Sequence, residues 1–332
     1  MYKISIFALN IMDMKKILGL FAFTLFFNGC DDGDIIIETI DFEDVTAVNC
    51  NLNDLLYKIK DSEALIIEMD NSENYYTNNT SETGSPTTVT INNSTNKVIY
   101  RSYSGEVATG NICATIPLAS PNVVEEWVAT AGTIEITTTA NVVSNTTSTA
   151  GNATKVSGYT HHFEFKNITF LKPNGEQQFY STYSFGDYVR NTNPYPFGFD
   201  EEDIKKCSIT NEFYNFSGKE SFVLNLDSSI YSGTAGTYTK VISATNKVSY
   251  KLFESTLSDS YFCSTTSPTT PVLSEEWKAV DGVSGVSGEI EIIATQVGSQ
   301  FEYKIYLKKV TLKRGNSQFY LGDNYYYGTI LN

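Results

Sequence analysis

Short runs of alternating apolar and polar residues fill most of the chain, and polar breaks separate them. Residues 64–69 and 221–226 are apolar or alternating runs, and residues 98–103 and 248–253 are further strand candidates. Alternation with a period of two is typical of strands that bury one face. The chain also holds 22 Tyr and 20 Phe with many Thr, a composition that favours strands. The pattern therefore predicts a mainly all-β protein.

Helical periodicity is rare, and its best instance covers residues 52–59. Leu55, Leu56 and Ile59 would share one face of a helix there, and Asn51 or Asn53 would cap its first turn. We therefore expect one short helix in this segment.

An internal repeat organises the body of the chain. Residues 95–132 and 245–282 are identical at 13 of 38 positions without a gap. Both tryptophans align, because one motif occurs twice, as Glu125-Glu126-Trp127 and as Glu275-Glu276-Trp277. Chance similarity in composition would not align both tryptophans together with a pair of cysteines. We expect the tryptophans in the core and the glutamates at its rim, as equivalent structural positions.

The repeat predicts two tandem antiparallel modules, each a β-sandwich or barrel-like. We place repeat 1 at 48–188, a linker at 189–204 and repeat 2 at 205–332. The linker contains Asn-Pro, Tyr-Pro and Phe-Gly, which are break signals. In each repeat a Thr-Asn-Lys motif, with Asn96 or Asn246 in the turn, predicts a hairpin between the strands before and after it.

The segment 137–160 of repeat 1 is rich in Thr, Ser, Asn and Gly, and its counterpart in repeat 2 is much shorter. A long polar insertion is typical of a binding loop, and equally of a tolerated, mobile loop. Both interpretations stay open from the sequence.

Four of the five cysteines fall at equivalent places, two in each repeat. Because a repeated unit should fold in the same way twice, we predict the disulfides Cys50–Cys113 and Cys207–Cys263, which an exported protein can form. The alternative is four free thiols in the core. We expect no metal site, since no Cys-x-x-Cys occurs and the two histidines, His161 and His162, are adjacent.

The segment 14–34 has the features of an export signal. Lys15 and Lys16 precede an apolar run at 17–27, which is shorter than the about 20 residues that span a bilayer as a helix. Such a run is typical of a cleaved signal segment. We therefore assign residues 1–29 to a signal segment, with the true start at Met14.

Two short motifs follow this apolar run. Phe27-Asn28-Gly29-Cys30 resembles the lipobox of bacterial lipoproteins, and Asp31-Asp32-Gly33-Asp34 resembles the surface-export signal of Bacteroidota lipoproteins. The resemblance implies acyl chains on Cys30 and a lipid-anchored place on the cell-surface side of the outer membrane. Residues 30–47 would then form a lipidated acidic tether. The resemblance is confined to this region and names no family for the body.

The formal net charge of −15 argues against nucleic-acid binding, which needs a basic surface. No nucleophile motif, phosphate loop or metalloprotease motif occurs, so we expect no enzyme, no catalytic residue and no cofactor. The repeated Glu-Glu pairs come nearest to catalytic carboxylates, but consecutive residues of a strand point to opposite faces. Exposed tyrosines for a sugar platform would come from Tyr325-Tyr326-Tyr327 or Tyr75-Tyr76.

We therefore expect a non-enzymatic binding module whose ligand is a glycan or an envelope protein. One alternative is a structural or accessory subunit of a cell-envelope complex, and a second is an uncharacterised hydrolase. Exposed aromatic side chains along a groove would favour the binding module, and a broad apolar patch would favour the accessory subunit. Converging carboxylates within a pocket would favour the hydrolase.

Overall fold

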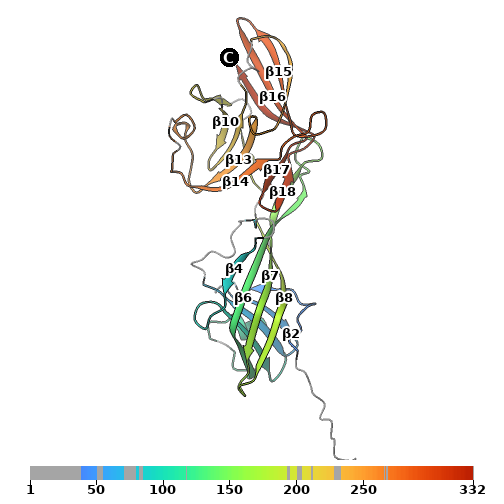
Figure 1. Ribbon diagram of the computed structural model, residues 1–332, viewed down its shortest axis with the longest axis vertical. Helices are drawn as coiled ribbons and strands as arrows, with labels where there is room; N and C mark the ends of the chain where they lie inside the picture. Colours follow the sequence, from blue (N-terminus) through green and yellow to red (C-terminus); the bar gives the residue numbers. More distant parts are fainter. Residues whose placement is uncertain are drawn as a thin grey trace, which may run out of the picture. The chain divides into compact units, whose positions relative to one another are not determined.

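A computed structural model describes residues 39–50, 55–70, 80–81, 85–116, 118–192, 195–199, 204–210, 212–227, 233–264, 266 and 268–331. The chain divides into two units at Asp41, and the architecture below belongs to the unit Phe42–Asn332. Its described part forms three antiparallel sheets and one short α-helix (Figure 1). The prediction of a mainly β protein is confirmed.

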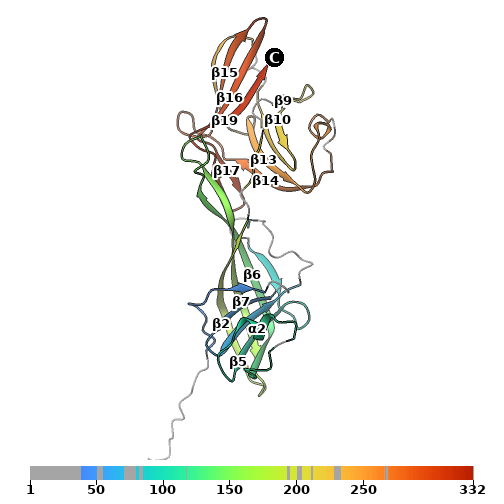
Figure 2. The same ribbon diagram turned by 180° about the vertical axis from the view of Figure 1, so that it is seen from behind.

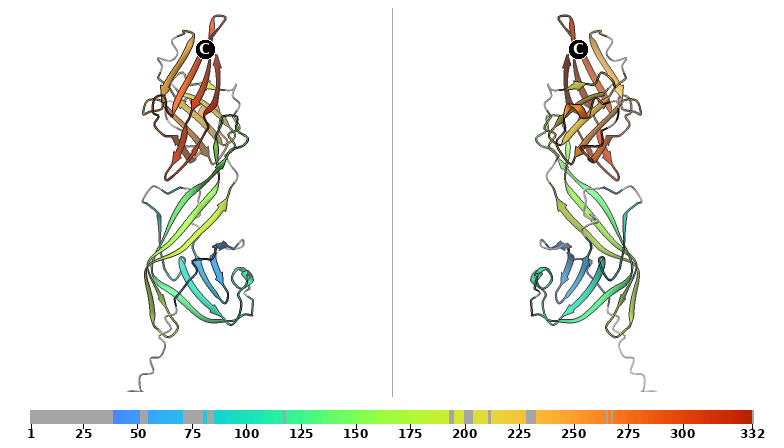
Figure 3. Two further views of the ribbon diagram at one scale, coloured as in Figure 1. Left: turned by 90° about the vertical axis from the view of Figure 1, so that its right-hand side faces the viewer. Right: turned by 90° about the vertical axis from the view of Figure 1, so that its left-hand side faces the viewer.

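Repeat 1 forms one eight-stranded sheet that curls into a half-barrel (Figure 3). The order is β1-β2-β3-β5-β6-β7-β8, and β4 pairs with the middle of β6. The helix α2, Thr109–Cys113, follows β5 (Figure 2). The strands are β1 Val48–Asn49, β2 Leu55–Lys60, β3 Glu63–Glu68, β4 Thr87–Thr90, β5 Lys97–Tyr103, β6 Val123–Ser144, β7 Thr154–Leu171 and β8 Gln177–Asn191.

Repeat 2 forms two sheets, with orders β18-β17-β14-β13-β11-β10-β9 and β12-β15-β16-β19. A 3₁₀ turn, η3 Asp259–Tyr261, follows β13. The strands are β9 Lys205–Lys206, β10 Glu212–Ser217, β11 Glu220–Asn225, β12 Gly236–Val241, β13 Lys247–Phe253, β14 Leu273–Ala279, β15 Glu289–Val297, β16 Gln300–Lys308, β17 Thr311–Arg314, β18 Ser317–Tyr320 and β19 Asn324–Leu331.

The repeats share their pairing and their bends. Tyr100 lies opposite Trp127 in repeat 1, as Tyr250 lies opposite Trp277 in repeat 2. A left-handed residue bends β7 at Asn167, with φ 51°, and its counterpart Lys309, with φ 50°, separates β16 from β17. A strand that is bent but continuous in repeat 1 is therefore interrupted in repeat 2. This difference explains why the single sheet of repeat 1 corresponds to two sheets in repeat 2.

Both predicted disulfides are present, Cys50–Cys113 and Cys207–Cys263. Each covers a small apolar cluster on one face of its repeat. The opposite face of repeat 2 carries a much larger core, in which Trp277 is completely buried. Trp127 is 1% exposed in repeat 1, so the tryptophans lie in the core as predicted.

The predicted helix at 52–59 is wrong over its described part, because residues 55–60 form β2. Leu56, Tyr57 and Lys58 are buried in succession, so both faces of this strand are covered. Burial on both faces removes the alternation that identifies a strand, and the remaining apolar positions fit a helix equally well. Residues 52–54 lie outside the described residues.

The predicted Thr-Asn-Lys hairpins are also wrong. β4 pairs with β6 and β12 pairs with β15, whereas β5 and β13 pair elsewhere. The Asn96 side chain instead accepts a hydrogen bond from the Asp70 backbone N–H and donates one to the Thr90 carbonyl. Asn246 makes the corresponding bonds in repeat 2, so this residue joins two chain segments at a crossover.

The polar segment 137–160 is mainly a β-hairpin and not a loop. β6 continues to Ser144 and β7 begins at Thr154, which leaves only 145–153 as a connection. Thr138 and Ala140 are buried, and the Ala140 N–H donates to the Ser317 hydroxyl of repeat 2 at 2.8 Å. The Asn316 side-chain amide also donates to the Thr139 hydroxyl at 3.0 Å, so this hairpin contacts the other repeat.

Candidate functional site

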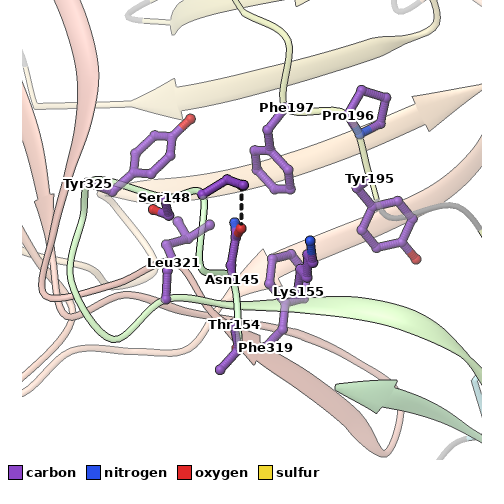
Figure 4. A pocket seen from close by; sticks show the side chains of 12 residues that line it. Asn145, Ser148, Thr154, Lys155, Tyr195, Pro196, Phe197, Phe319, Leu321 and Tyr325 are labelled. Atoms are coloured by element: carbon purple, nitrogen blue, oxygen red, sulfur yellow. Dashed lines mark hydrogen bonds between the residues drawn. The ribbon is translucent and has the colours of Figure 1, made fainter. Parts of the chain in front are cut away.

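A pocket of about 220 Å³ lies where the tip of the β6–β7 hairpin meets repeat 2. We call it the junction pocket. Figure 4 shows its lining side chains. They are Asn145, Thr147, Ser148, Ala153, Thr154, Lys155, Tyr195, Pro196, Phe197, Phe319, Leu321 and Tyr325. The Thr147 hydroxyl donates to the Asn145 side-chain oxygen at 2.9 Å.

Backbone hydrogen bonds hold the hairpin tip against repeat 2. The N–H groups of Asp323 and Asn324 donate to the carbonyls of Gly151 and Ala150, both at 2.9 Å. Thr154 Oγ accepts a bond of 2.7 Å from the Tyr320 N–H. Because most of these bonds use main-chain atoms, the position of the tip depends on the backbone of both repeats.

Aromatic rings from the linker form a second wall of the junction pocket. The ring of Phe197 stacks on that of Tyr250, with centroids 4.2 Å apart and planes 12° apart. Phe197 also lies edge-on to Phe319 and Tyr325, at 6.0 and 6.4 Å. Tyr195, Phe197 and Tyr325 are each half-buried, so their rings are partly accessible.

One buried carboxylate fixes this linker segment. Glu220, which is 3% exposed, accepts hydrogen bonds from the N–H groups of Phe197 and Gly198 at 3.1 and 2.8 Å. The Tyr250 hydroxyl donates to the same carboxylate at 2.6 Å. Burial and the adjacent Glu220 charge raise the pKa of Tyr250, so its hydroxyl stays protonated as a donor.

A second buried carboxylate lies behind Tyr195. Glu275 accepts a hydrogen bond from the Tyr195 hydroxyl at 2.8 Å and pairs with Arg314 at 2.7 Å. The hydroxyls of Tyr195 and Tyr159 are also hydrogen-bonded. Burial, with the Glu275 charge as a further cause, raises the pKa of Tyr159 to about 12. The polar groups here are mutually satisfied, and they hold Tyr195 in place.

The two Glu-Glu pairs do not converge on a site. Glu126 pairs with Arg101 at 2.7 Å, and Glu276 pairs with Lys278 at 3.1 Å. Glu275 departs from the expected rim position, because it is 9% exposed and lies on the same face as Trp277, whose Nε1 donates to it. Its partners in the core are polar side chains, an arrangement that a linear pattern does not show.

The adjacent histidines point to opposite faces of β7, as two consecutive strand residues must. The two histidines are not a solvated pair, because His161 is completely buried and hydrogen-bonded to the Thr138 hydroxyl at 2.8 Å. Burial, with Arg190 as a second cause, lowers the pKa of His161 to about 4. Exposed His162 bonds Asp187 at 2.6 Å. No group of three potential metal ligands occurs among the described residues.

Of the tyrosines considered for a platform, Tyr325 lines the junction pocket. Tyr326 lies on the other face of β19 beside Tyr306, and Tyr327 is buried, donating to the Phe222 carbonyl at 2.8 Å. Tyr75-Tyr76 lie outside the described residues, as does Cys30. Sequence reasoning missed the linker aromatics, although the alternation in Tyr195-Pro196-Phe197-Gly198-Phe199 was a signal for them.

No known protein family, curated protein or solved structure matches the chain. Among the described residues no helix is long and apolar enough to cross a membrane.

Proposed function

We propose that the chain is a lipid-anchored, non-enzymatic binding protein of the outer membrane surface, and that the junction pocket binds a glycan. The observation that carries the proposal is the wall of half-buried aromatic rings, Tyr195, Phe197 and Tyr325, opposite a hairpin tip of short polar side chains. Sugar rings present an apolar C–H face and many hydroxyl groups. They therefore fit a pocket that combines aromatic and apolar side chains with several polar groups.

The electrostatics of the pocket favour binding over hydrolysis. Glycoside hydrolysis requires two carboxyl groups that face one bond. The side chains that line the junction pocket include no Asp or Glu. Glu275 lies behind Tyr195, where Arg314 and two further donors occupy its oxygens.

A panel of glycans, titrated against the mature chain by calorimetry, would test the pocket. Tyr325→Ala should weaken binding by about tenfold or more, the size expected for truncating a central aromatic contact. The matched control is Tyr306→Ala, because Tyr306 is a half-buried tyrosine of the same sheet that does not line the pocket. Equal affinity for the Tyr325 variant and the wild type would refute the proposal.

The proposed anchor is tested separately. Cys30→Ser should shift the protein from the membrane fraction to the soluble fraction and prevent the mass increase from acyl chains. An unchanged distribution would contradict acylation at Cys30. The two disulfides support an export route, since they form in oxidising compartments.

A second candidate is an accessory subunit of an envelope complex. Its support is β8, a 15-residue edge strand that pairs only with β7 among the described strands. Phe179 and Val189 on it are 57% and 54% exposed. Long exposed edges are sites where a partner can add a strand. Cross-linking in the native envelope would recover one partner in fixed proportion if this candidate holds, and no such partner if the protein acts alone.

A further inference from the structure

A groove on the outer face of repeat 2 lies apart from the junction pocket and shares none of its residues. It encloses about 360 Å³ over β11, β13 and β14. Residues paired directly across these strands point to the same side, and here they form two rows, Val223–Ser249–Lys278 and Ser221–Lys251–Glu276. The opposite side of the same sheet packs in the core around Trp277.

Lysines dominate the charged side chains of this groove. Lys247, Lys251 and Lys278 line it, together with Glu276 and Asp281. Glu276 contacts two of the lysines, Lys278 at 3.1 Å and Lys251 at 3.8 Å. Lys247 makes no ion pair with any of the described residues, because the residue opposite it is Asn225. The groove thus carries a local positive charge on a chain whose net charge is −15.

Repeat 1 provides an internal reference for this face. There Lys97 pairs with Glu68 at 3.1 Å, and Arg101 pairs with Glu126 at 2.7 Å, so the positive and negative charges balance. The equivalents of Lys97, Arg101 and Glu126 are retained in repeat 2 as Lys247, Lys251 and Glu276.

Three other positions on this face differ between the repeats. Glu68, Ile99 and Val128 of repeat 1 are replaced in repeat 2 by Asn225, Ser249 and Lys278. Each change removes a negative charge or an apolar surface and adds a polar or positive group. The repeat 2 face has therefore gained one lysine and lost one glutamate, and its three lysines outnumber Glu276 and Asp281.

We propose that this groove binds a saccharide that carries carboxylate groups. Lysine ammonium groups attract carboxylates as point charges, and the aliphatic stems of the same side chains offer apolar surface to the C–H face of a sugar ring. Ser249 and Asn225 supply neutral partners for hydroxyl groups. An acidic peptide fits less well, because β13 is paired on both sides and offers no free edge to an added strand.

Calorimetric titration of the mature chain with short oligogalacturonates tests the proposal. The variant Lys247→Gln/Lys278→Val, which installs the repeat 1 residue at position 278, should weaken binding by roughly 2- to 30-fold, as expected for two exposed charge pairs. Both side chains are exposed, so a thermal melt should show an unchanged fold. Binding should also weaken as salt is raised.

Three comparisons can overturn the assignment. The matched variant Lys97→Gln in repeat 1 should leave the affinity unchanged, and an equal loss there would indicate non-specific attraction. Methyl-esterified oligogalacturonate, which keeps the rings and loses the charges, should not bind. An Asp/Glu peptide of the same charge that bound as tightly would refute a saccharide ligand. Wild-type affinity of the double variant would refute the site itself, whatever the junction pocket binds.

Discussion

Replacing Glu220 by Gln tests whether one buried carboxylate holds the linker in the junction pocket. Its two oxygens accept three hydrogen bonds, from the N–H groups of Phe197 and Gly198 and from the Tyr250 hydroxyl. An amide has one acceptor oxygen. If that oxygen accepts from Tyr250 and Phe197, the NH₂ group of the glutamine faces the Gly198 N–H. Both groups are donors, so neither can bond the other.

The expected cost follows from these bonds. A hydrogen bond to a charged group contributes about 1.5–3 kcal/mol, a neutral one about 1 kcal/mol, and a buried donor without a partner costs about 1–3 kcal/mol. Glu220→Gln loses one bond, weakens two and leaves a donor opposed. We expect the free energy of unfolding of repeat 2 to fall by roughly 3 kcal/mol.

The internal repeat supplies a matched control. Glu63 occupies the equivalent position in repeat 1, where it accepts a hydrogen bond of 2.5 Å from Tyr100. A glutamine keeps an acceptor for that one bond, so Glu63→Gln should cost about 1 kcal/mol. The difference between the two variants isolates the bonds to the linker.

Tryptophan fluorescence during urea unfolding reports each repeat separately, because the chain has two tryptophans and one lies in each. A Trp127→Phe background leaves Trp277 as the reporter of repeat 2, and a Trp277→Phe background does the converse. Limited proteolysis within 192–204 should also accelerate in Glu220→Gln. Equal losses in the two glutamine variants, or unchanged proteolysis, would refute the anchoring role of Glu220.

Three further outcomes are expected. Cys207→Ser/Cys263→Ser should lower stability by about 4 kcal/mol in calorimetry, since the bond closes a separation of 56 residues; a loss under 1 kcal/mol would contradict this. The pKa of His161 is lowered to about 4, so between pH 6.5 and 4 the unfolded chain binds a proton that the folded chain does not. The free energy of unfolding should therefore fall by at most about 3 kcal/mol as the pH is lowered through this window. His161→Asn should reduce this pH dependence in unfolding experiments. Gly322→Val places a Cβ 2.5 Å from Ala150 at φ +119° and should cost about 3 kcal/mol more than Gly175→Val, where φ is +87° and nothing lies within 4 Å.

The strands and the disulfide pairing could be predicted because each depends on a pattern that occurs twice. The apolar run in β3 recurs in β11, Cys113 and Cys263 lie at the same distance from the Glu-Glu-Trp motif, and each repeat has a second cysteine upstream. A pattern that arises by chance in one repeat is improbable at the equivalent positions of the other repeat. The domain boundaries remain a prediction, since the described core of repeat 2 also takes in Ala140, Val156 and Tyr159 from repeat 1.

The rest depends on contacts that no local pattern encodes. Thr138 reads as an exposed strand residue, yet its backbone N–H donates to the Ser81 hydroxyl and its side chain bonds His161 in the interior. Pro196 reads as a break, yet its neighbours Tyr195 and Phe197 pack in the core of repeat 2. Polar and turn-forming residues are buried here because partners distant in sequence satisfy them, and sequence alone does not reveal those partners.

The junction pocket requires both repeats and exists once, although the module occurs twice. Repeat 1 contributes the extended hairpin, for which β15 and β16 are the shorter counterpart, and the linker and repeat 2 contribute the aromatic wall. A ligand that contacts both sides binds only the docked arrangement, so it stabilises the contact between Gly151 and Asp323 by mass action. The same linkage works in reverse: any change that weakens docking lowers the population able to bind. The pocket is thus built from non-equivalent parts of the two copies, and the affinity that we propose for it would depend on how firmly the copies are joined.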